Sequence, residues 1–153
     1  MRALWLLPGV PFLLVHGFSL AMDRMEKAPP GAVVEDRRIA EGFGVRVYAL
    51  RRAEARGSLV LIHGTPGSTF AWMEQFRQPP LGWDVIAYDR PGFGASGGVR
   101  DEPALDFQVR VLRQAVLRGD LRRPVLLVGH SYGAPVALRA AGAAVSQPAK
   151  PSP

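Results

Sequence analysis

The stretch that decides the fold is PVLLVGHSYGAPVALRAAGAA, residues 124–144. The apolar run PVLLV predicts a strand, and the alanine-rich end predicts a helix. Between them stands Gly-His-Ser-Tyr-Gly, which has the form G-x-S-x-G. At a tight turn between strand and helix, this pattern holds a serine oxygen out beyond the end of the strand, where only glycine fits at Gly129 and Gly133. We therefore expect Ser131 to be a nucleophile.

The same pattern occurs a second time, as Gly94-Ala95-Ser96-Gly97-Gly98. No strand-like run immediately precedes this copy, and no helical stretch immediately follows it. The pattern alone is therefore weak, and its context favours Ser131 over Ser96.

A second loop fits the same chemistry. His63-Gly64-Thr65-Pro66-Gly67-Ser68 directly follows the apolar run SLVLI. A loop there can bring a backbone amide, that of Thr65, opposite the amide of Tyr132, so that both face a developing negative charge at the start of a helix. We expect His63 and Gly64 to support this loop, because a histidine beside a glycine turn more often braces the turn than acts as a base.

Strands and helices alternate along the rest of the chain. AVVEDRRIA and VRVYALRR predict a hairpin across Gly42-Phe43-Gly44. The short apolar runs fit strands buried on both faces of a parallel sheet; they are Ser58–Ile62, Trp83–Tyr88 and Pro124–Val128. Helices are expected over Thr69–Gln78 and Pro103–Arg118, the second with Asp101 as its cap and one apolar face, Leu105, Val109, Leu112 and Val116. The alternation predicts an α/β fold, a three-layer sandwich with a mostly parallel sheet.

The first 31 residues have a different character. Arg2 is followed by an apolar stretch and by Ser19-Leu20-Ala21, so residues 1–21 resemble a signal peptide cleaved after Ala21, for export to the periplasm or out of the cell. The alternatives are a retained membrane tether through residues 3–21 and a buried N-terminal helix. His16 belongs to this segment and is not expected to be catalytic. Residues 22–31 form a linker, residues 32–145 the folded domain and residues 146–153 a disordered tail.

Composition excludes several classes of function. The chain has 153 residues, of which 48% are hydrophobic, and no cysteine, so disulfides and thiolate chemistry are absent. The formal net charge of +6 arises from dispersed basic residues that form no nucleic-acid-binding motif. We expect no nucleic-acid partner, no metal site and no cofactor.

Three motifs in this order, HGTPGS (63–68), YDRPGFGASG (88–97) and GHSYGAPVAL (129–138), resemble the α/β-hydrolase fold family over about Val33 to Ala144. The resemblance implies Ser131 as nucleophile and a small-molecule acyl substrate. Serine at position 131 speaks against the haloalkane dehalogenases and epoxide hydrolases, which share a similar HG-x-P loop. Ester, lactone, amide or C–C bond hydrolysis stay open. Asp89 lies in a turn that is structural in this family and is a poor choice for the acid of a catalytic triad.

In this family an Asp or Glu and then a His follow the serine. After Ser131 the sequence contains no Asp, no Glu and no His. His130 is adjacent, but successive side chains of a strand point to opposite faces. We therefore expect the N-terminal half of a hydrolase, truncated after the helix that follows the serine. Three hypotheses follow: a serine hydrolase by descent, an inactive fragment or binding module, and a chain whose fold is completed by a second chain.

Overall fold

The computed structural model of the chain describes residues 28–98 and 104–145. The expected signal peptide or tether, most of the linker, Asp101, Pro103 and the tail lie outside the described residues. Within those ranges, no helix is both long and apolar enough to cross a bilayer.

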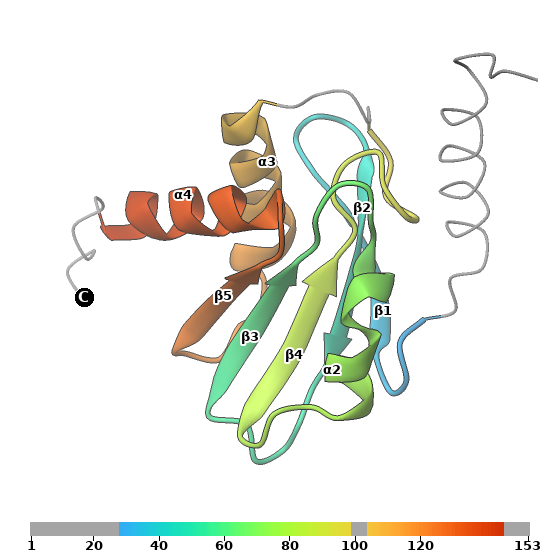
Figure 1. The fold of residues 1–153 in the computed structure, drawn as a ribbon, viewed down its shortest axis with the longest axis vertical. Coiled ribbons are helices and arrows are strands. Elements are labelled where there is room, and N and C mark those ends of the chain that lie inside the picture. The colour runs from blue at the N-terminus through green and yellow to red at the C-terminus, as the bar shows by residue number, and fades with distance from the viewer. Residues whose placement is uncertain (1–27, 99–103, 146–153) are drawn as a thin grey trace, which may run out of the picture.

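The described strands form one sheet in the order β1-β2-β4-β3-β5 (Figure 1). Their bounds are Val33–Arg38 (β1), Gly44–Leu50 (β2), Gly57–Ile62 (β3), Trp83–Tyr88 (β4) and Val125–Gly129 (β5). β2 runs antiparallel to β1 and to β4, whereas β3 is parallel to β4 and to β5. The α/β fold and the hairpin are confirmed. The sheet is mixed, because β2 runs in the direction opposite to that of the other four described strands.

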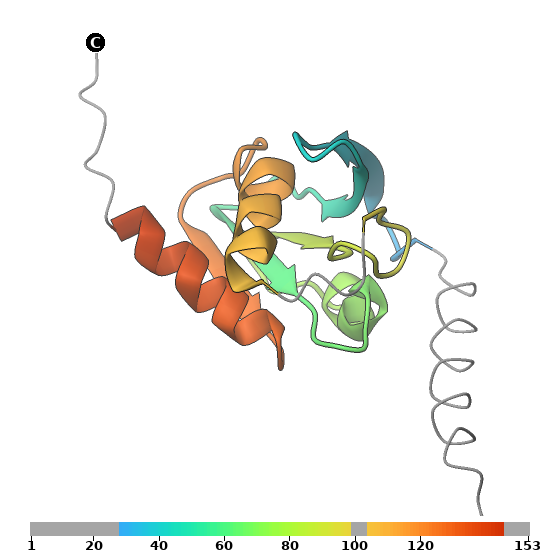
Figure 2. The ribbon, with the colours of Figure 1, turned by 90° about the horizontal axis from the view of Figure 1, so that it is seen from above.

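Helices cover both faces of this sheet (Figure 2). On one face α3 (Leu105–Leu112) and α4 (Gly133–Val145) enclose the larger core with Val47, Val60 and Ile86. On the other face the short α2 (Met73–Arg77) contributes Phe76 to a smaller core with Leu59 and Leu61. Alternate residues of each central strand thus enter opposite cores, as the geometry of a strand requires. The three layers follow from this alternation.

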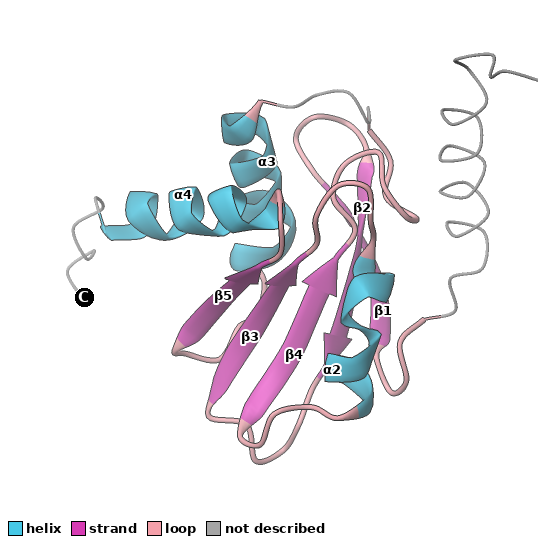
Figure 3. Cartoon of the chain, viewed as in Figure 1, coloured by secondary structure: helices cyan, strands magenta, loops and turns pink. Residues whose placement is uncertain are grey.

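The helices differ in detail from the prediction (Figure 3). The segment expected to be helical over 69–78 begins as a 3₁₀ turn, η1 (Thr69–Trp72), and only then becomes α2. α3 begins at Leu105, so the expected start at Pro103 was two residues early. Its N-cap is Ala104, which provides no side-chain cap. α3 continues as a π-helical turn, η2 (Arg113–Leu117). The apolar face of α3 and η2 enters the core as predicted, with Val109, Leu112 and Val116 buried.

Strand β5 was expected to be buried on both faces, and this is wrong. Every residue of β3 is buried, whereas those of β5 are half-buried or exposed, and Leu126 keeps 50% of its surface exposed. The physical reason is position: β5 is the last described strand of the sheet and pairs only with β3.

Candidate active site

Two loops meet at one end of the sheet because β3 and β5 are parallel neighbours. Ile62 is in register with Gly129, and both strands end there. The backbone N–H of His130 donates to the Ile62 carbonyl, with an N···O distance of 3.0 Å. The loop after β3 and the turn after β5 therefore leave the sheet side by side.

The turn after β5 holds Ser131 in an unusual conformation. Its φ is 52°, and it is the one non-glycine residue with positive φ among the residues described. A non-glycine residue in this left-handed region is strained by about 1–3 kcal/mol, and such strain is concentrated at functional sites. Ser131 is also exposed, and within the described part of the chain no hydrogen bond engages its hydroxyl. The oxygen is therefore presented to solvent at the end of the sheet.

The two glycines of this turn are required by close packing. A methyl group built on Gly129 would lie 2.2 Å from the Gly133 carbonyl oxygen, and one built on Gly133 would lie 2.1 Å from the Ile62 oxygen. No real Cβ fits at such distances from backbone atoms. Helix α4 starts at Gly133 and is thereby drawn tightly against the end of β3. The N-terminus of α4, with its partial positive charge, points at Ser131.

The loop after β3 touches this turn through Gly64. Gly64 is buried, and a methyl built on it would lie 2.8 Å from the Ser131 Cβ and 3.1 Å from the His130 carbonyl oxygen. Thr65 follows and is exposed; among the described residues its amide donates no hydrogen bond. The structure therefore brings Gly64, Thr65, Ser131 and Tyr132 together from two separate motifs.

His63 lies beneath this loop with no exposed surface. Its Nε2 accepts a hydrogen bond from the Arg90 backbone N–H at 2.9 Å. Its Nδ1 must therefore carry the proton, which it donates to the Gly64 carbonyl at 2.8 Å. Burial, with a smaller contribution from the charge of Arg90, lowers the pKa of His63 to about 3. A neutral imidazole with both nitrogens engaged braces the loop and is unavailable as a base.

His130 does not follow the rule of alternating faces on which its exclusion depended. β5 ends at Gly129, and the left-handed Ser131 breaks the extended geometry. The His130 Nδ1 lies 3.2 Å from a methyl built on Gly64, close to the same point as the Ser131 Cβ. The ring is exposed, and within the residues described it makes no hydrogen bond to Ser131. Its side chain is near the site without engaging the serine.

Asp89 and Ser96 belong to a separate turn. The Asp89 carboxylate is fully buried and accepts from the Thr69 N–H at 2.8 Å, the Ala95 N–H at 3.0 Å and the Tyr48 hydroxyl at 3.1 Å. The Ser96 hydroxyl donates to the Asp89 carbonyl at 2.6 Å and accepts from the Arg46 N–H at 2.8 Å. Both side chains are used to hold the turn together.

Sequence reasoning gave no role to Arg90, whose side chain is only 1% exposed. Burial lowers its pKa. Arginine in a polar glycine-containing turn has the sequence signature of an exposed residue, so no local pattern marks its burial. Only the tertiary structure shows that it packs under the loop that contains Gly64.

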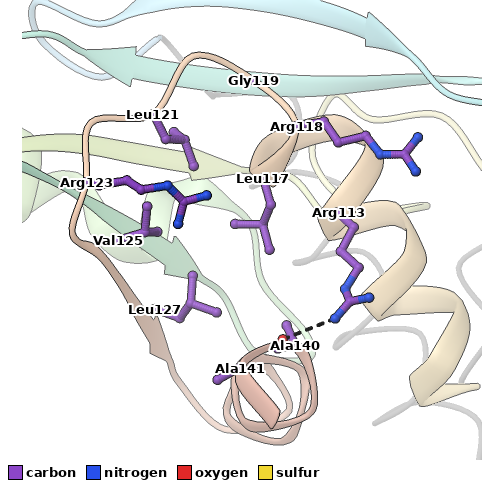
Figure 4. Close-up of a pocket in the computed structure, with 10 residues that line it drawn as sticks. All are labelled: Arg113, Leu117, Arg118, Gly119, Leu121, Arg123, Val125, Leu127, Ala140 and Ala141. Atoms are coloured by element: carbon purple, nitrogen blue, oxygen red, sulfur yellow. Dashed lines mark hydrogen bonds between the residues drawn. The ribbon is translucent and has the colours of Figure 1, made fainter. Parts of the chain in front are cut away.

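A groove of about 480 Å³ lies beside β5, away from the predicted residues (Figure 4). Its floor is apolar, and arginines stand around it. The lining residues are Arg113, Leu117, Arg118, Gly119, Leu121, Arg123, Val125, Leu127, Ala140 and Ala141. None of the three arginines forms an ion pair with a described carboxylate, and Arg113 donates to the Ala140 carbonyl at 3.3 Å. We call this feature the β5 groove.

Comparison with known families agrees with this geometry. Residues 59–152 match the model of the alpha/beta hydrolase family. The chain belongs to this family. The match includes both loops of the site and the helix that follows Ser131. The sheet order and the turn after β5 are thus those of an alpha/beta hydrolase.

The individual relatives align with this chain over only part of their own length. The chain is 34% identical over 109 residues to epoxide hydrolase B of Mycobacterium tuberculosis, with 65% of this chain and 30% of the relative aligned. It is 33% identical over 90 residues to human protein ABHD8, with 58% and 20% aligned. The haloalkane dehalogenase DatA of Agrobacterium tumefaciens has a similar structure, with a TM-score of 0.64, 28% identity, and coverage of 76% of this chain and 38% of that one. The chain therefore spans about a fifth to two fifths of these relatives' lengths.

Proposed function

We propose that this alpha/beta hydrolase acts on an acyl substrate, with Ser131 as the nucleophile. The observation that carries the proposal is the exposed Ser131 at φ 52°, packed against Gly64 at the start of α4. Ser131 Oγ attacks the carbonyl carbon, and the Thr65 and Tyr132 amides stabilise the oxyanion. A base takes the serine proton and passes it to the leaving group, which departs. Water then attacks the serine ester, which releases the carboxylic acid and restores the serine hydroxyl.

The chemistry of serine favours acyl over alkyl substrates. Some of the relatives are named as a haloalkane dehalogenase or epoxide hydrolases. If Ser131 displaced a halide or opened an epoxide, the enzyme would be left with a serine ether. An ether has no carbonyl for water to attack, so the enzyme would not turn over. An acylated serine is an ester, which water can hydrolyse. Ser131 therefore supports ester, lactone or amide hydrolysis.

Serine needs a base to become nucleophilic. Among the described residues the candidates near Ser131 are His63, which is buried and engaged, and His130, which makes no hydrogen bond to the serine. We propose that the site is preformed and that the base comes from polypeptide outside the described residues.

The test is labelling by a fluorophosphonate in the presence and absence of free imidazole. Ser131 Oγ attacks phosphorus, fluoride leaves, and imidazole takes the serine proton. We expect slow labelling that imidazole accelerates, no labelling of Ser131→Ala, and unchanged labelling of the matched control Ser96→Ala. If imidazole accelerates nothing and wild type labels no faster than Ser131→Ala, the chain is an inactive hydrolase or a binding module.

We also propose that the open edge of β5 binds a second polypeptide chain that completes the site. Three observations support this. β5 is wholly apolar, yet among the described strands it pairs with β3 alone; Leu126 and, on α4, Leu138 are 50% and 74% exposed. An uncovered apolar edge strand is a template for strand pairing. The β5 groove carries arginines 113, 118 and 123 without described acidic partners, which favours an occupant that carries carboxylates.

Photo-crosslinking tests this second proposal. p-Benzoylphenylalanine is placed at position 126 and, as a control, at position 81, where Leu81 is 85% exposed in the turn before β4. We expect a product specific to position 126, whose partner chain contains His and Asp and accelerates the labelling of Ser131 when added back. A product containing only a second copy of this chain, or equal products at both positions, would overturn the proposal.

A further inference from the structure

Arg90 is a buried cation beside the candidate site. Its side chain is 1% exposed, and within the described residues no carboxylate lies at ion-pair distance from it. An unpaired charge in a protein interior is costly unless polar groups replace its water shell. The polar groups that replace water around the Arg90 guanidinium therefore show which parts of the structure Arg90 holds in place.

The guanidinium donates to three consecutive residues of the loop after β3. Nε donates to the His63 carbonyl at 3.0 Å, and Nη2 donates both to the Gly64 carbonyl at 2.8 Å and to the Thr65 hydroxyl. The backbone N–H of Arg90 also donates to His63 Nε2. Because the three guanidinium bonds come from one rigid planar group, they fix the loop as a unit.

The same guanidinium also packs against two aromatic rings, one of which belongs to the turn that contains Ser131. Its Cζ lies 5.0 Å from the centre of the Tyr132 ring and 4.7 Å from the centre of the Phe93 ring. A cation over an aromatic face is favourable, and more so when both are shielded from water. Arg90 therefore contacts both the loop that contains the Thr65 amide and the residue that contributes the second amide.

We propose that Arg90 is a positioning residue that holds the two halves of the oxyanion hole in register. The inference rests on the proposed function, because the oxyanion hole has a purpose only if Ser131 attacks a carbonyl. Arg90 does not touch the reacting atoms. It fixes the Gly64 carbonyl from below, while the Gly64 Cα abuts Ser131, so the loop and the serine turn keep a constant separation.

Arginine is required here rather than any cation. The planar fork reaches carbonyls from Nε and Nη2 at once while its face stacks on Tyr132. An ammonium group is compact and more strongly hydrated, and it offers no flat face. Lysine is therefore expected to fail as a substitute even though it keeps the charge.

The test separates binding of the fluorophosphonate from the bond-forming step, with imidazole present. We expect Arg90→Lys to lower the maximal rate of phosphonylation by about 10–100-fold, because a small displacement of catalytic groups has an effect of this size. The concentration giving half-maximal rate should change less than twofold. The control Arg37→Lys alters an arginine that binds the Ala115 carbonyl at 2.8 Å, away from the site, and should leave both constants unchanged.

Hydrogen exchange gives a readout that needs no activity. In Arg90→Lys, amides of residues 64–65 and 131–132 should exchange faster, while those of β3 and β4 keep their protection. If wild type does not label at all, the proposed function fails, yet faster exchange confined to these residues still supports Arg90 as the link between the loops. Thr65→Val, which removes one acceptor without altering the buried charge, should show a smaller change of the same kind. An unchanged phosphonylation rate in folded Arg90→Lys, or exchange that rises equally throughout β3 and β4, would overturn the proposal.

Discussion

The chain contains two turns with the same sequence pattern and opposite structures. Gly129–Gly133 links β5 to α4 and leaves the hydroxyl of Ser131 exposed. Gly94–Gly98 lies in a loop after β4, and the hydroxyl of Ser96 is held between the Asp89 carbonyl and the Arg46 N–H. In the first turn the backbone is strained and the oxygen is available. In the second, the oxygen is part of the hydrogen-bonding that shapes the loop.

The difference teaches that a serine's role depends on what its oxygen already binds. A structural serine satisfies backbone groups that would otherwise be unpaired, so removing it lowers stability. A nucleophile is held by its neighbours and contributes little to the fold. Removing a nucleophilic serine should therefore abolish the reaction without lowering the free energy of unfolding.

The largest effect is expected at Gly133, the last glycine of the turn after β5, and the equivalent glycine of the other turn, Gly98, provides the comparison. Gly133→Ala would place a methyl 2.1 Å from the Ile62 carbonyl oxygen, where neither backbone segment can yield. We expect a loss of about 4 kcal/mol or more in the free energy of unfolding, which is the range of the most disruptive core substitutions. Gly98 has a φ of 97°, and the methyl of Gly98→Ala would lie 3.1 Å from the Phe43 ring and 3.2 Å from the Pro91 Cβ, both of which are side-chain atoms. Its loss should be about 1–2 kcal/mol.

Urea unfolding of both variants at one pH measures these losses. Equal losses would mean that the two turns are under similar packing constraints, and the distinction drawn between them would then depend on the serines alone.

Much of this fold could be predicted from the sequence because hydropathy patterns report burial. The runs at 58–62 and 83–88 form β3 and β4, within one residue at each end. Strand β5 shows the limit of that reasoning. PVLLV is as apolar as SLVLI, yet β5 is half-exposed, because a strand's burial depends on how many neighbours pair with it. No property of the five residues themselves specifies that number.

The candidate site divides in the same way. The pattern around Ser131 and the loop at 63–68 were predicted from local sequence, and the structure places them side by side. Arg90 was not, because its importance comes from contacts with residues 25 to 27 positions away and with Tyr132. Long-range packing around a buried charge leaves no periodic or compositional signal.

Acid should lower the stability of the protein through His63, which braces the loop that packs against Ser131. The native pKa of His63 is about 3, below the ordinary value of 6.5. At a pH between these two pKa values, His63 is protonated in the unfolded chain and neutral in the native chain. The free energy of unfolding therefore falls as the pH is lowered from 6.5 toward 3. Between pH 7 and pH 5 we expect a loss of about 2 kcal/mol from this residue.

The variant His63→Asn isolates that contribution, since asparagine has a donor near the position of Nδ1 but does not titrate. Urea unfolding at pH 7 and pH 5 should show a smaller loss for the variant than for wild type, by about the same 2 kcal/mol. A loss of equal size in both proteins would mean that other groups cause the acid sensitivity.

The smallest effects compare the serines themselves. Ser96→Ala leaves the Asp89 carbonyl and the Arg46 N–H without their partner, so stability should fall by about 1–2 kcal/mol. Ser131→Gly removes the side chain from a residue at φ 52°, a conformation that glycine adopts without strain, and should raise stability by about 0.5–1 kcal/mol while abolishing fluorophosphonate labelling. If urea unfolding shows a lower free energy of unfolding for Ser96→Ala and a higher one for Ser131→Gly, Ser96 stabilises the fold and the conformation of Ser131 destabilises it. A fall in stability for Ser131→Gly matching that of Ser96→Ala would instead assign Ser131 a structural role, because strain that is relieved by glycine cannot also be what stabilises the turn.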